Sequence, residues 1–163
     1  MAGPLEGIRV IDITKTIAGP YSASLLGDMG ADVTKVEPPG TGDDFRYAAP
    51  IVEGESYYFM MANRNKKSIT LNLKNEKGKK ILFALVKDAD VFIESYRPGT
   101  VKRLGVYYKA IKEVNPQIVY CSISGFGQDG PLRDRAAYDL VLQSMGGIMS
   151  VTGSPGGPPT PVG

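Results

Sequence analysis

The loop over residues 125–140 carries the densest set of side chains that could bind a charged ligand. It contains the arginines Arg133 and Arg135 together with acidic side chains. It follows the most strand-like run of the chain, residues 118–124, and open α/β sheets bind ligands beyond the carboxyl ends of their strands. The arginines suit an anionic ligand or solvent, so a plain surface loop stays open as the alternative.

The glycines of residues 125–130 also match the dinucleotide pattern GxGxxG. That fingerprint requires a helix directly after the last glycine and an acidic residue about 20 positions further on. Here Pro131 and a polar run follow instead, and no acidic residue stands at that distance. The pattern therefore indicates a glycine-rich loop rather than a dinucleotide fingerprint.

Similar chemistry collects after other expected strands, at residues 15–19 and 95–103. Tyr96 and Arg97, with Arg103 further on, could stack on a base and bind phosphates, or could be a surface aromatic with charged neighbours. Pro20 suits the first turn of a helix. That helix start could hold a carboxylate or phosphate, or could be a plain strand-to-helix turn.

The composition bounds the classes of protein that remain. The 163 residues suit one domain, and 42% hydrophobic and 22% charged residues are typical of a globular protein. A net charge of +2 without a basic tract argues against nucleic-acid binding. No apolar stretch approaches the ~20 residues that span a bilayer, so no membrane association is expected.

The absence of histidine excludes Ser-His-Asp and Cys-His catalysis and argues against a transition-metal site, so no metal is expected. The single cysteine, Cys121, lies in an apolar run and is interpreted as a buried structural thiol. A chain without a disulfide framework suits a reducing, cytoplasmic compartment.

Expected strands alternate with expected helices along the chain, with a turn-rich loop at residues 38–44, an irregular stretch over 47–55 and a short helix or buried segment over 57–61. Strands are expected at residues 7–14, 32–37, 68–74, 91–94 and 118–124, and helices at 21–29, 75–89, 107–114 and 140–149. A further short helix is expected to be entered at Pro98 and closed by residues 102–105. This alternation predicts an α/β fold with a doubly wound, mainly parallel sheet. Residues 1–150 are expected to form one domain. Residues 151–163, rich in proline and glycine, are expected to have no fold of their own and to lead into a longer protein.

Taken together, the motifs of these segments make the chain resemble the family III CoA-transferases, also called the CaiB/BaiF family. This family includes formyl-CoA and carnitine CoA-transferases. The similarity covers essentially the whole chain, and the order and spacing of its motifs make it specific. The motifs lie at residues 4–12, 18–20, 26–33, 36–40, 65–69, 90–99, 115–116 and 124–131.

The resemblance implies the N-terminal, Rossmann-like part of the family's large domain. It implies an enzyme that transfers CoA between carboxylic acids through an acyl intermediate on an aspartate, with acyl-CoA and a carboxylic acid as substrates and no permanently bound cofactor. It also implies an interlocked homodimer. The implied CoA-binding residues are Ile17, Ala18, Pro38, Leu71, Asn72, Leu73, Lys74, Ser95, Tyr96, Arg97, Arg103, Ala136, Ala137, Tyr138 and Asp139.

Three positions depart from the family pattern. Pro38 and Ala136 stand where some members place an arginine and a lysine, although Arg133 and Arg135 are close enough to Ala136 to substitute. Ile17 replaces a glutamine of the formyl-CoA enzymes, which weakens the expectation of formate or oxalate as substrates.

The resemblance places the nucleophilic aspartate a few residues after 158–160, beyond Gly163, so none of Asp129, Asp134 or Asp139 is expected to be the nucleophile. The 163-residue chain alone is therefore expected to be inactive. One alternative is an α-methylacyl-CoA racemase, in which a histidine stands at the position of Tyr138. The other is a CoA-binding module without catalysis.

Overall fold

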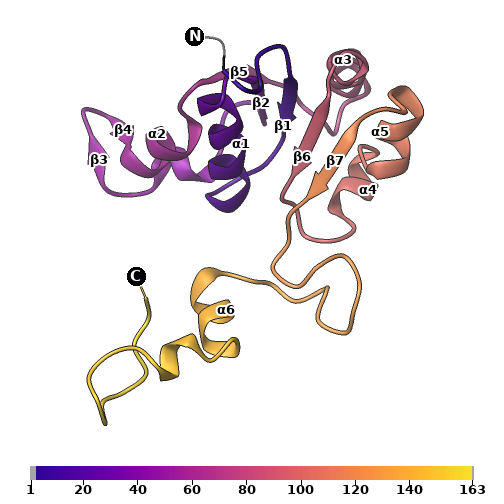
Figure 1. Ribbon diagram of the computed structural model, residues 1–163. Helices are drawn as coiled ribbons and strands as arrows, with labels where there is room; N and C mark the ends of the chain where they lie inside the picture. The colour runs from indigo at the N-terminus through magenta and orange to yellow at the C-terminus, as the bar shows by residue number, and fades with distance from the viewer. Residues whose placement is uncertain (1–2, 163) are drawn as a thin grey trace. The chain divides into compact units, whose positions relative to one another are not determined.

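The computed structural model describes residues 3–162, which form two compact units that meet between Ile123 and Ser124 (Figure 1). The first unit contains the sheet. The boundary expected at residue 150 does not coincide with this division, and the assignment of residues 1–150 to one CoA-binding domain stays a prediction. Within residues 3–162 no helix is both long enough and apolar enough to cross a membrane.

The core of the first unit is a parallel five-stranded sheet. Its strands are β1 (Arg9–Asp12), β2 (Asp32–Glu37), β5 (Lys66–Thr70), β6 (Val91–Glu94) and β7 (Val119–Ser122). They lie in the order β5-β2-β1-β6-β7, so the direction of winding reverses between β1 and β6. This order is that of a doubly wound Rossmann-like sheet, which confirms the predicted fold class.

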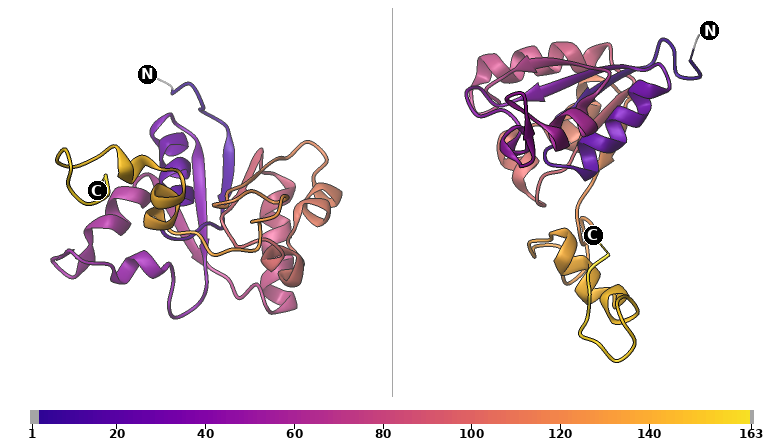
Figure 2. Two further views of the ribbon diagram at one scale, coloured as in Figure 1. Left: turned by 90° about the horizontal axis from the view of Figure 1, so that it is seen from below. Right: turned by 90° about the vertical axis from the view of Figure 1, so that its left-hand side faces the viewer.

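Helices cover both faces of the sheet (Figure 2). The α1 helix (Ala18–Asp28) covers one face, and α3 (Glu76–Lys87), α4 (Thr100–Leu104) and α5 (Tyr108–Val114) cover the other. The α2 helix (Tyr57–Asn63) packs against α1. Successive residues of β1 point to opposite faces, as the pleat requires. Val10 therefore belongs to the cluster that contains Ala23 of α1, and Ile11 to the cluster that contains Leu82 of α3.

The stretch between β2 and β5 is more ordered than the sequence indicated. It contains a 3₁₀ helix, Asp44–Tyr47, and a small antiparallel pair, β3 (Ile51–Val52) with β4 (Glu55–Ser56). Ser56 then caps α2, because its hydroxyl accepts a hydrogen bond from the Phe59 N–H at 3.3 Å. The short helix that was one of the readings of residues 57–61 is thus confirmed.

Local signals set the ends of the longer helices. The α1 helix ends just before Gly30. Gly30 has a φ of 101°, a backbone conformation that is strained for a residue with a side chain. The α3 helix begins after Asn75, whose side-chain oxygen accepts a hydrogen bond from the Lys77 N–H at 2.9 Å. These ends agree with the expected helices to within a few residues.

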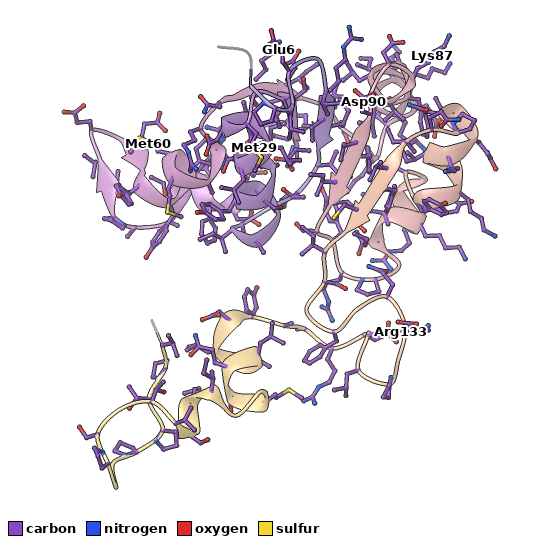
Figure 3. All side chains as sticks on the ribbon, viewed as in Figure 1. Glu6, Met29, Met60, Lys87, Asp90 and Arg133 are labelled. Carbon is purple, nitrogen blue, oxygen red and sulfur yellow. The ribbon has the colours of Figure 1, made fainter. Side chains whose placement is uncertain are left out.

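The outer side of α1 is also apolar. Tyr21, Leu25 and Met29 follow one another at intervals of four residues and are 37–43% exposed. Met60 of the neighbouring α2 is 43% exposed, and Figure 3 labels it together with Met29. The α1 helix is therefore less amphipathic than α3, whose lysines face solvent.

The predicted third strand is displaced by a few residues. The sequence alternates over residues 68–74, but β5 spans Lys66–Thr70. Its partner β2 ends at Glu37, and the last bond between them runs from the Leu71 N–H to the Glu37 carbonyl at 2.8 Å. Leu71 and Leu73 consequently lie in the loop beyond the strand, where they are still buried at 6% and 9% exposure.

The expectation of a buried Cys121 is wrong, because its side chain is exposed. It lies on β7, an edge strand of the sheet. The α1 helix packs over β1, β2 and β6. The neighbouring Val119, which points to the same face as Cys121, is 61% exposed.

The second unit, residues 124–162, contains one α-helix, α6 (Asp139–Met145), and a 3₁₀ turn, Ile148–Ser150. Gly147, with φ 78°, interrupts the helix that was expected to reach residue 149. None of the residues described in this unit is buried. Its proline-rich end contains neither helix nor strand, although the Thr160 N–H donates to the Met149 carbonyl at 3.1 Å.

Candidate functional site

The loops that follow β1, β2, β5 and β6 all leave the sheet at one edge, because these strands are parallel. Ligands of open α/β sheets bind at this edge, where the winding direction reverses. In the first unit that position lies between the ends of β1 and β6.

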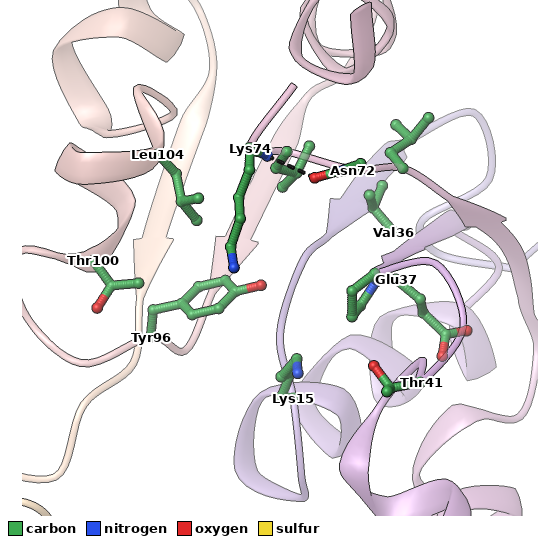
Figure 4. A pocket seen from close by; sticks show the side chains of 12 residues that line it. Lys15, Val36, Glu37, Thr41, Asn72, Lys74, Tyr96, Thr100 and Leu104 are labelled. Atoms are coloured by element: carbon green, nitrogen blue, oxygen red, sulfur yellow. Dashed lines mark hydrogen bonds between the residues drawn. The ribbon is translucent and has the colours of Figure 1, made fainter. Parts of the chain in front are cut away.

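A cavity of about 300 Å³ opens at this edge (Figure 4). We call it the carboxyl-edge cavity. Six of the residues that line it belong to the expected CoA-binding set: Pro38, Leu71, Asn72, Leu73, Lys74 and Tyr96. The other lining residues are Lys15, Val36, Glu37, Thr41, Thr100 and Leu104.

One part of the carboxyl-edge cavity is suited to a flat apolar group. Leu71, Leu73 and Leu104 contribute aliphatic surface, and Tyr96 contributes an aromatic ring. Burial, reinforced by the charge of Glu94, raises the pKa of Tyr96 to about 12, so the phenol is neutral at physiological pH. Aromatic rings of this kind stack on nucleobases.

The charged part of the cavity is positive. Lys15 and Lys74 line it, and Glu37 is the one acid among the lining residues. The Glu37 carboxylate is occupied by Arg46, with Oε1 2.7 Å from Nη2 and Oε2 2.8 Å from Nε. The paired carboxylate therefore leaves the ammonium groups of Lys15 and Lys74 to attract an anion.

The state of Glu37 follows from its contacts. Burial by itself raises its pKa, but hydrogen bonds from Arg46, Ser68 and the Asp43 N–H outweigh burial and lower the pKa to about 2. Glu37 thus stays ionised at physiological pH and fixes the loop after β2.

A buried ion pair holds the loops after β1 and β2 together. Lys35 Nζ lies 2.9 Å from Asp43 Oδ2, and both side chains are almost wholly buried. Asp43 Oδ1 also accepts the Thr16 N–H at 3.0 Å, and Lys35 Nζ donates to the Thr14 carbonyl at 3.0 Å. Removal of either charge would leave the other buried without its partner, which is costly.

A second buried lysine fixes the start of α1. Lys66 Nζ lies 2.8 Å from Asp12 Oδ2 and donates to the Pro20 carbonyl at 2.7 Å and to Asn63 Oδ1 at 3.0 Å. Burial lowers the pKa of Lys66, and the charge of Asp12 opposes that change. Lys66 therefore joins β1, α1 and α2 beneath the site.

The loops after β1 and β6 are also joined. Ser95 Oγ accepts the Lys15 N–H at 3.0 Å, and Glu94 Oε2 accepts the Tyr96 N–H at 2.8 Å. Burial raises the pKa of Glu94, while hydrogen bonds from Ser122 and from the Tyr96 N–H lower it. These contacts set the positions of Lys15 and Tyr96 relative to each other.

The remaining expected residues lie outside the lining of this cavity. The Ser95 hydroxyl contacts the lining residue Lys15 by accepting its backbone N–H. Ile17 and Ala18 stand at the beginning of α1, where Ile17 is 39% exposed. Arg103 lies on α4, and its Nη2 donates to Oγ1 of the lining residue Thr100 at 2.9 Å. Arg97 follows Tyr96 in the same loop.

Ala136, Ala137, Tyr138 and Asp139 belong to the second unit. Tyr138 is 76% exposed, and the Asp139 carboxylate accepts a hydrogen bond from Gln143. Arg133, labelled in Figure 3, has its Nε 3.4 Å from Asp134. No α-helix follows the glycines of residues 125–130 until Asp139, in agreement with the interpretation of a plain glycine-rich loop.

Two of the other lining residues, Lys15 and Thr100, lie in the ranges 15–19 and 95–103 where ligand-binding chemistry was expected to collect, but neither was named as a CoA-binding residue. Val36, Glu37, Thr41 and Leu104 were not expected in the site. Lys15 carried a usable signal, since it is the first charged residue after the polar end of the first strand. Leu104 carried no such signal, because the sequence of a short helix does not show which of its apolar side chains faces a cavity.

Comparisons with known proteins identify the class that this fold and site define. The profile of CoA-transferase family III matches residues 5–163. The chain belongs to CoA-transferase family III, as its motifs predicted.

Two relatives and one solved structure illustrate the match. The chain is 49% identical over 161 residues to an acetyl-CoA:oxalate CoA-transferase of Acetobacter aceti, covering 99% of this chain and 41% of that protein. It is 48% identical to the human succinyl-CoA:glutarate CoA-transferase, covering 96% of this chain and 36% of that protein.

The crystal structure of a CAIB/BAIF family protein from Brucella suis superposes with a TM-score of 0.94 at 43% identity, covering 100% of this chain and 44% of that one. The chain thus spans about two fifths of the length of the relatives that it matches.

Proposed function

We propose that the intact protein is an acyl-CoA:carboxylate CoA-transferase and that the carboxyl-edge cavity binds the nucleotide end of CoA. The observation that carries this proposal is one cavity that combines the Tyr96 ring and aliphatic walls with the ammonium groups of Lys15 and Lys74. A nucleotide has the matching parts, a flat base and phosphates. Membership in CoA-transferase family III supports CoA as that nucleotide.

The residues divide the task by their chemistry. Tyr96 stacks on the base, and the Leu71 and Leu104 side chains exclude water from it. Lys74 and Arg103 attract the phosphates from the loop after β5 and from α4. Ile17 and Ala18, at the start of α1, lie toward the acyl end of the substrate.

The chemical step requires a carboxylate nucleophile, which we assign to an aspartate beyond residue 163. Its oxygen attacks the thioester carbonyl of acyl-CoA, the carbon–sulfur bond breaks, and CoA leaves as a thiolate while a mixed anhydride forms. The thiolate then attacks the aspartyl carbonyl, which releases the first carboxylate and leaves an aspartyl thioester of CoA.

The acceptor carboxylate attacks this thioester, so that a second mixed anhydride forms and the CoA thiolate is released again. Attack of the thiolate on the new acyl carbonyl yields the new acyl-CoA and restores the aspartate. No external oxidant, reductant or metal is consumed in this sequence. In this sequence the described residues hold CoA, while the sulfur end of CoA moves between the aspartate and the acyl groups.

The identity of the two acids depends on residues outside this chain. One relative is named for oxalate and another for glutarate, at nearly equal identity. Ile17 led to the expectation that oxalate is disfavoured as a substrate. The similarity to an enzyme named for oxalate does not support that expectation. A panel of acetyl-, formyl- and succinyl-CoA against oxalate and glutarate is therefore the appropriate first assay.

Calorimetry with CoA tests the binding part of the proposal. Tyr96→Ala should weaken CoA binding by about 1–3 kcal/mol, the usual contribution of a base stacked on an aromatic ring. Tyr57→Ala, which removes a 53% exposed tyrosine from α2, is the matched control and should leave the affinity unchanged. Equal affinities of the two variants would exclude Tyr96 from the site.

The catalytic part needs a separate measurement on the intact protein. Hydroxylamine should convert the aspartate to a protein-bound aspartyl hydroxamate during turnover if an aspartyl anhydride or thioester forms, because it displaces the carboxylate or the CoA thiolate from the activated aspartyl carbonyl. Tight CoA binding without turnover or a trapped adduct would indicate a binding module instead. Deuterium exchange at the α-carbon of a 2-methylacyl-CoA without CoA transfer would indicate a racemase, although residues 1–163 contain no histidine to act as the base.

A further inference from the structure

Lys15 is the one lysine that reaches the carboxyl-edge cavity from the loop after β1. The loop stands at the reversal of the winding direction, between the ends of β1 and β6. In doubly wound sheets the diphosphate of a bound nucleotide lies beside the turn that follows the first strand. Lys15 is therefore placed where a diphosphate would be expected.

The backbone of Lys15 is fixed on both sides. Its N–H donates to Ser95 Oγ at 3.0 Å, and its carbonyl accepts the Thr16 hydroxyl at 2.6 Å. Thr16 adopts a left-handed conformation, with φ 67°, which the bond from its N–H to Asp43 Oδ1 stabilises. A residue with a positive φ at this point fixes the direction in which the loop presents Lys15.

The side chain of Lys15, in contrast, has only a weak partner. Its Nζ lies 3.7 Å from Asp44 Oδ2, beyond hydrogen-bond distance, and the Asp44 side chain is 67% exposed. An exposed ion pair of this kind contributes little. The Lys15 ammonium can therefore exchange Asp44 for a stronger anionic partner at small cost.

Both lysines line the cavity together with Tyr96. In the view of Figure 4, the Lys74 and Lys15 side chains are drawn on different sides of the Tyr96 ring. A base stacked on Tyr96 would then have two cations in the same cavity. Lys74 comes from the loop after β5, and Lys15 from the loop after β1.

We propose that Lys15 binds the diphosphate of CoA and so sets the preference of the site for the phosphorylated nucleotide over its uncharged pantetheine part. This inference rests on the proposed function and adds a phosphate-binding residue to it. The Ser95 hydroxyl acts on the same interaction as a positioning group, because it holds the Lys15 backbone.

Calorimetry on the intact protein tests the inference with three probes: CoA, dephospho-CoA, which lacks the 3′-phosphate, and pantetheine, which lacks all phosphates. Lys15→Met should weaken CoA and dephospho-CoA binding by about 10- to 100-fold each, as expected for a hydrogen bond to a charged group. Binding of pantetheine should not change. The affinity of the variant for CoA should also depend less on salt concentration than that of the unmodified protein.

Lys67→Met is the matched control. Lys67 forms an exposed ion pair with Asp32, 2.8 Å apart, at the beginning of β2 and so at the opposite edge of the sheet. The Lys67→Met substitution removes the same charge as Lys15→Met, but at a residue that does not line the cavity. It should leave the affinities for all three probes unchanged. Lys15→Arg, which keeps the charge, should bind CoA within about threefold of the unmodified protein, and melting curves show whether each variant is folded.

The outcomes separate the two proposals. If the unmodified protein does not bind CoA, the proposed function fails. If it binds CoA but Lys15→Met and Lys67→Met bind it equally well, only the inference about Lys15 fails. A loss with CoA that is absent with dephospho-CoA would assign Lys15 to the 3′-phosphate and contradict the diphosphate contact.

Discussion

At the scale of single residues, Glu37 shows how an acid can line a site for anions. Its carboxylate accepts hydrogen bonds from Arg46, Ser68 Oγ and the Asp43 N–H. The charge is thereby held against the loop rather than offered to the cavity. The same contacts make the stability of the protein sensitive to acid.

We predict that Glu37→Gln removes part of this sensitivity. The pKa of Glu37 is lowered to about 2 in the folded state from its ordinary value of 4.5, so its stabilising effect is complete above that ordinary value and is lost as the pH falls toward 2. At pH 7 the variant should lose on the order of 2–3 kcal/mol of unfolding free energy, and the difference should vanish in acid.

Urea unfolding at several pH values between 7 and 3 measures this. Glu53→Gln changes an exposed acid in the same region and should stay within about 0.5 kcal/mol of the unmodified protein. A deficit of Glu37→Gln that is the same at every pH would show that the contacts of Glu37 do not depend on its charge.

The expected role of Arg103 in binding the CoA phosphates stays a prediction. It lies on α4 and donates to Thr100, which lines the carboxyl-edge cavity. We expect Arg103→Ala to weaken CoA binding by about 1–3 kcal/mol, as for a hydrogen bond to a charged group. Unchanged affinity, measured beside Lys112→Ala on α5 as the control, would remove Arg103 from the site.

At the scale of elements, the loop of residues 71–74 depends on a glycine in the helix that follows it. A Cβ built on Gly78 of α3 would lie 2.2 Å from the Asn72 carbonyl oxygen and 2.8 Å from its carbon. Gly78 is buried within the helix, so the close approach of the loop to α3 requires a residue without a side chain.

We therefore predict that Gly78→Ala destabilises the protein, although the same change elsewhere in a helix gains about 1 kcal/mol. Overpacking against a backbone carbonyl should cost about 1–3 kcal/mol and should displace Asn72 and Leu73, so that CoA binding weakens as well. Lys80→Ala, at an exposed position of the same helix, is the control. A Gly78→Ala variant that is more stable than the unmodified protein would contradict the packing described here.

Most elements could be predicted because local signals agree with the final packing. Gly30 and Asn75 mark helix ends by the backbone conformation and the cap that they provide. The alternation at residues 68–74 predicted a strand but not its end, because that end is set by where β2 stops. Cys121 was misplaced because composition shows an apolar strand but not whether a helix covers it.

The site divides in the same way. The loops of residues 71–74 and of Tyr96 were expected from motif resemblance to bind CoA, and the structure brings them together in one cavity, where CoA binding stays a prediction. Lys15 and Thr41 come from loops whose approach depends on the Lys35–Asp43 pair, a contact between distant parts of the sequence. Such contacts cannot be derived from spacing along one chain.

At the scale of the whole molecule, the chain covers about two fifths of its relatives, and we predict that the isolated 163-residue chain lacks CoA-transferase activity. The residues that line the cavity offer groups for binding only. Asp139 is the nearest candidate for a nucleophile among the described acids of the second unit, and its carboxylate accepts a hydrogen bond from Gln143. Chain and intact protein should be assayed side by side with the same acyl-CoAs and hydroxylamine. Turnover or a trapped adduct on the short chain that Asp139→Asn abolishes would contradict this.

A crystal structure of the intact protein with CoA would show whether the nucleotide of CoA occupies the carboxyl-edge cavity. We predict that the base lies against the Tyr96 ring and that the diphosphate lies within hydrogen-bond distance of Lys15 Nζ. A nucleotide bound elsewhere, without contact to Tyr96, Leu104 or either lysine of the cavity, would contradict this prediction.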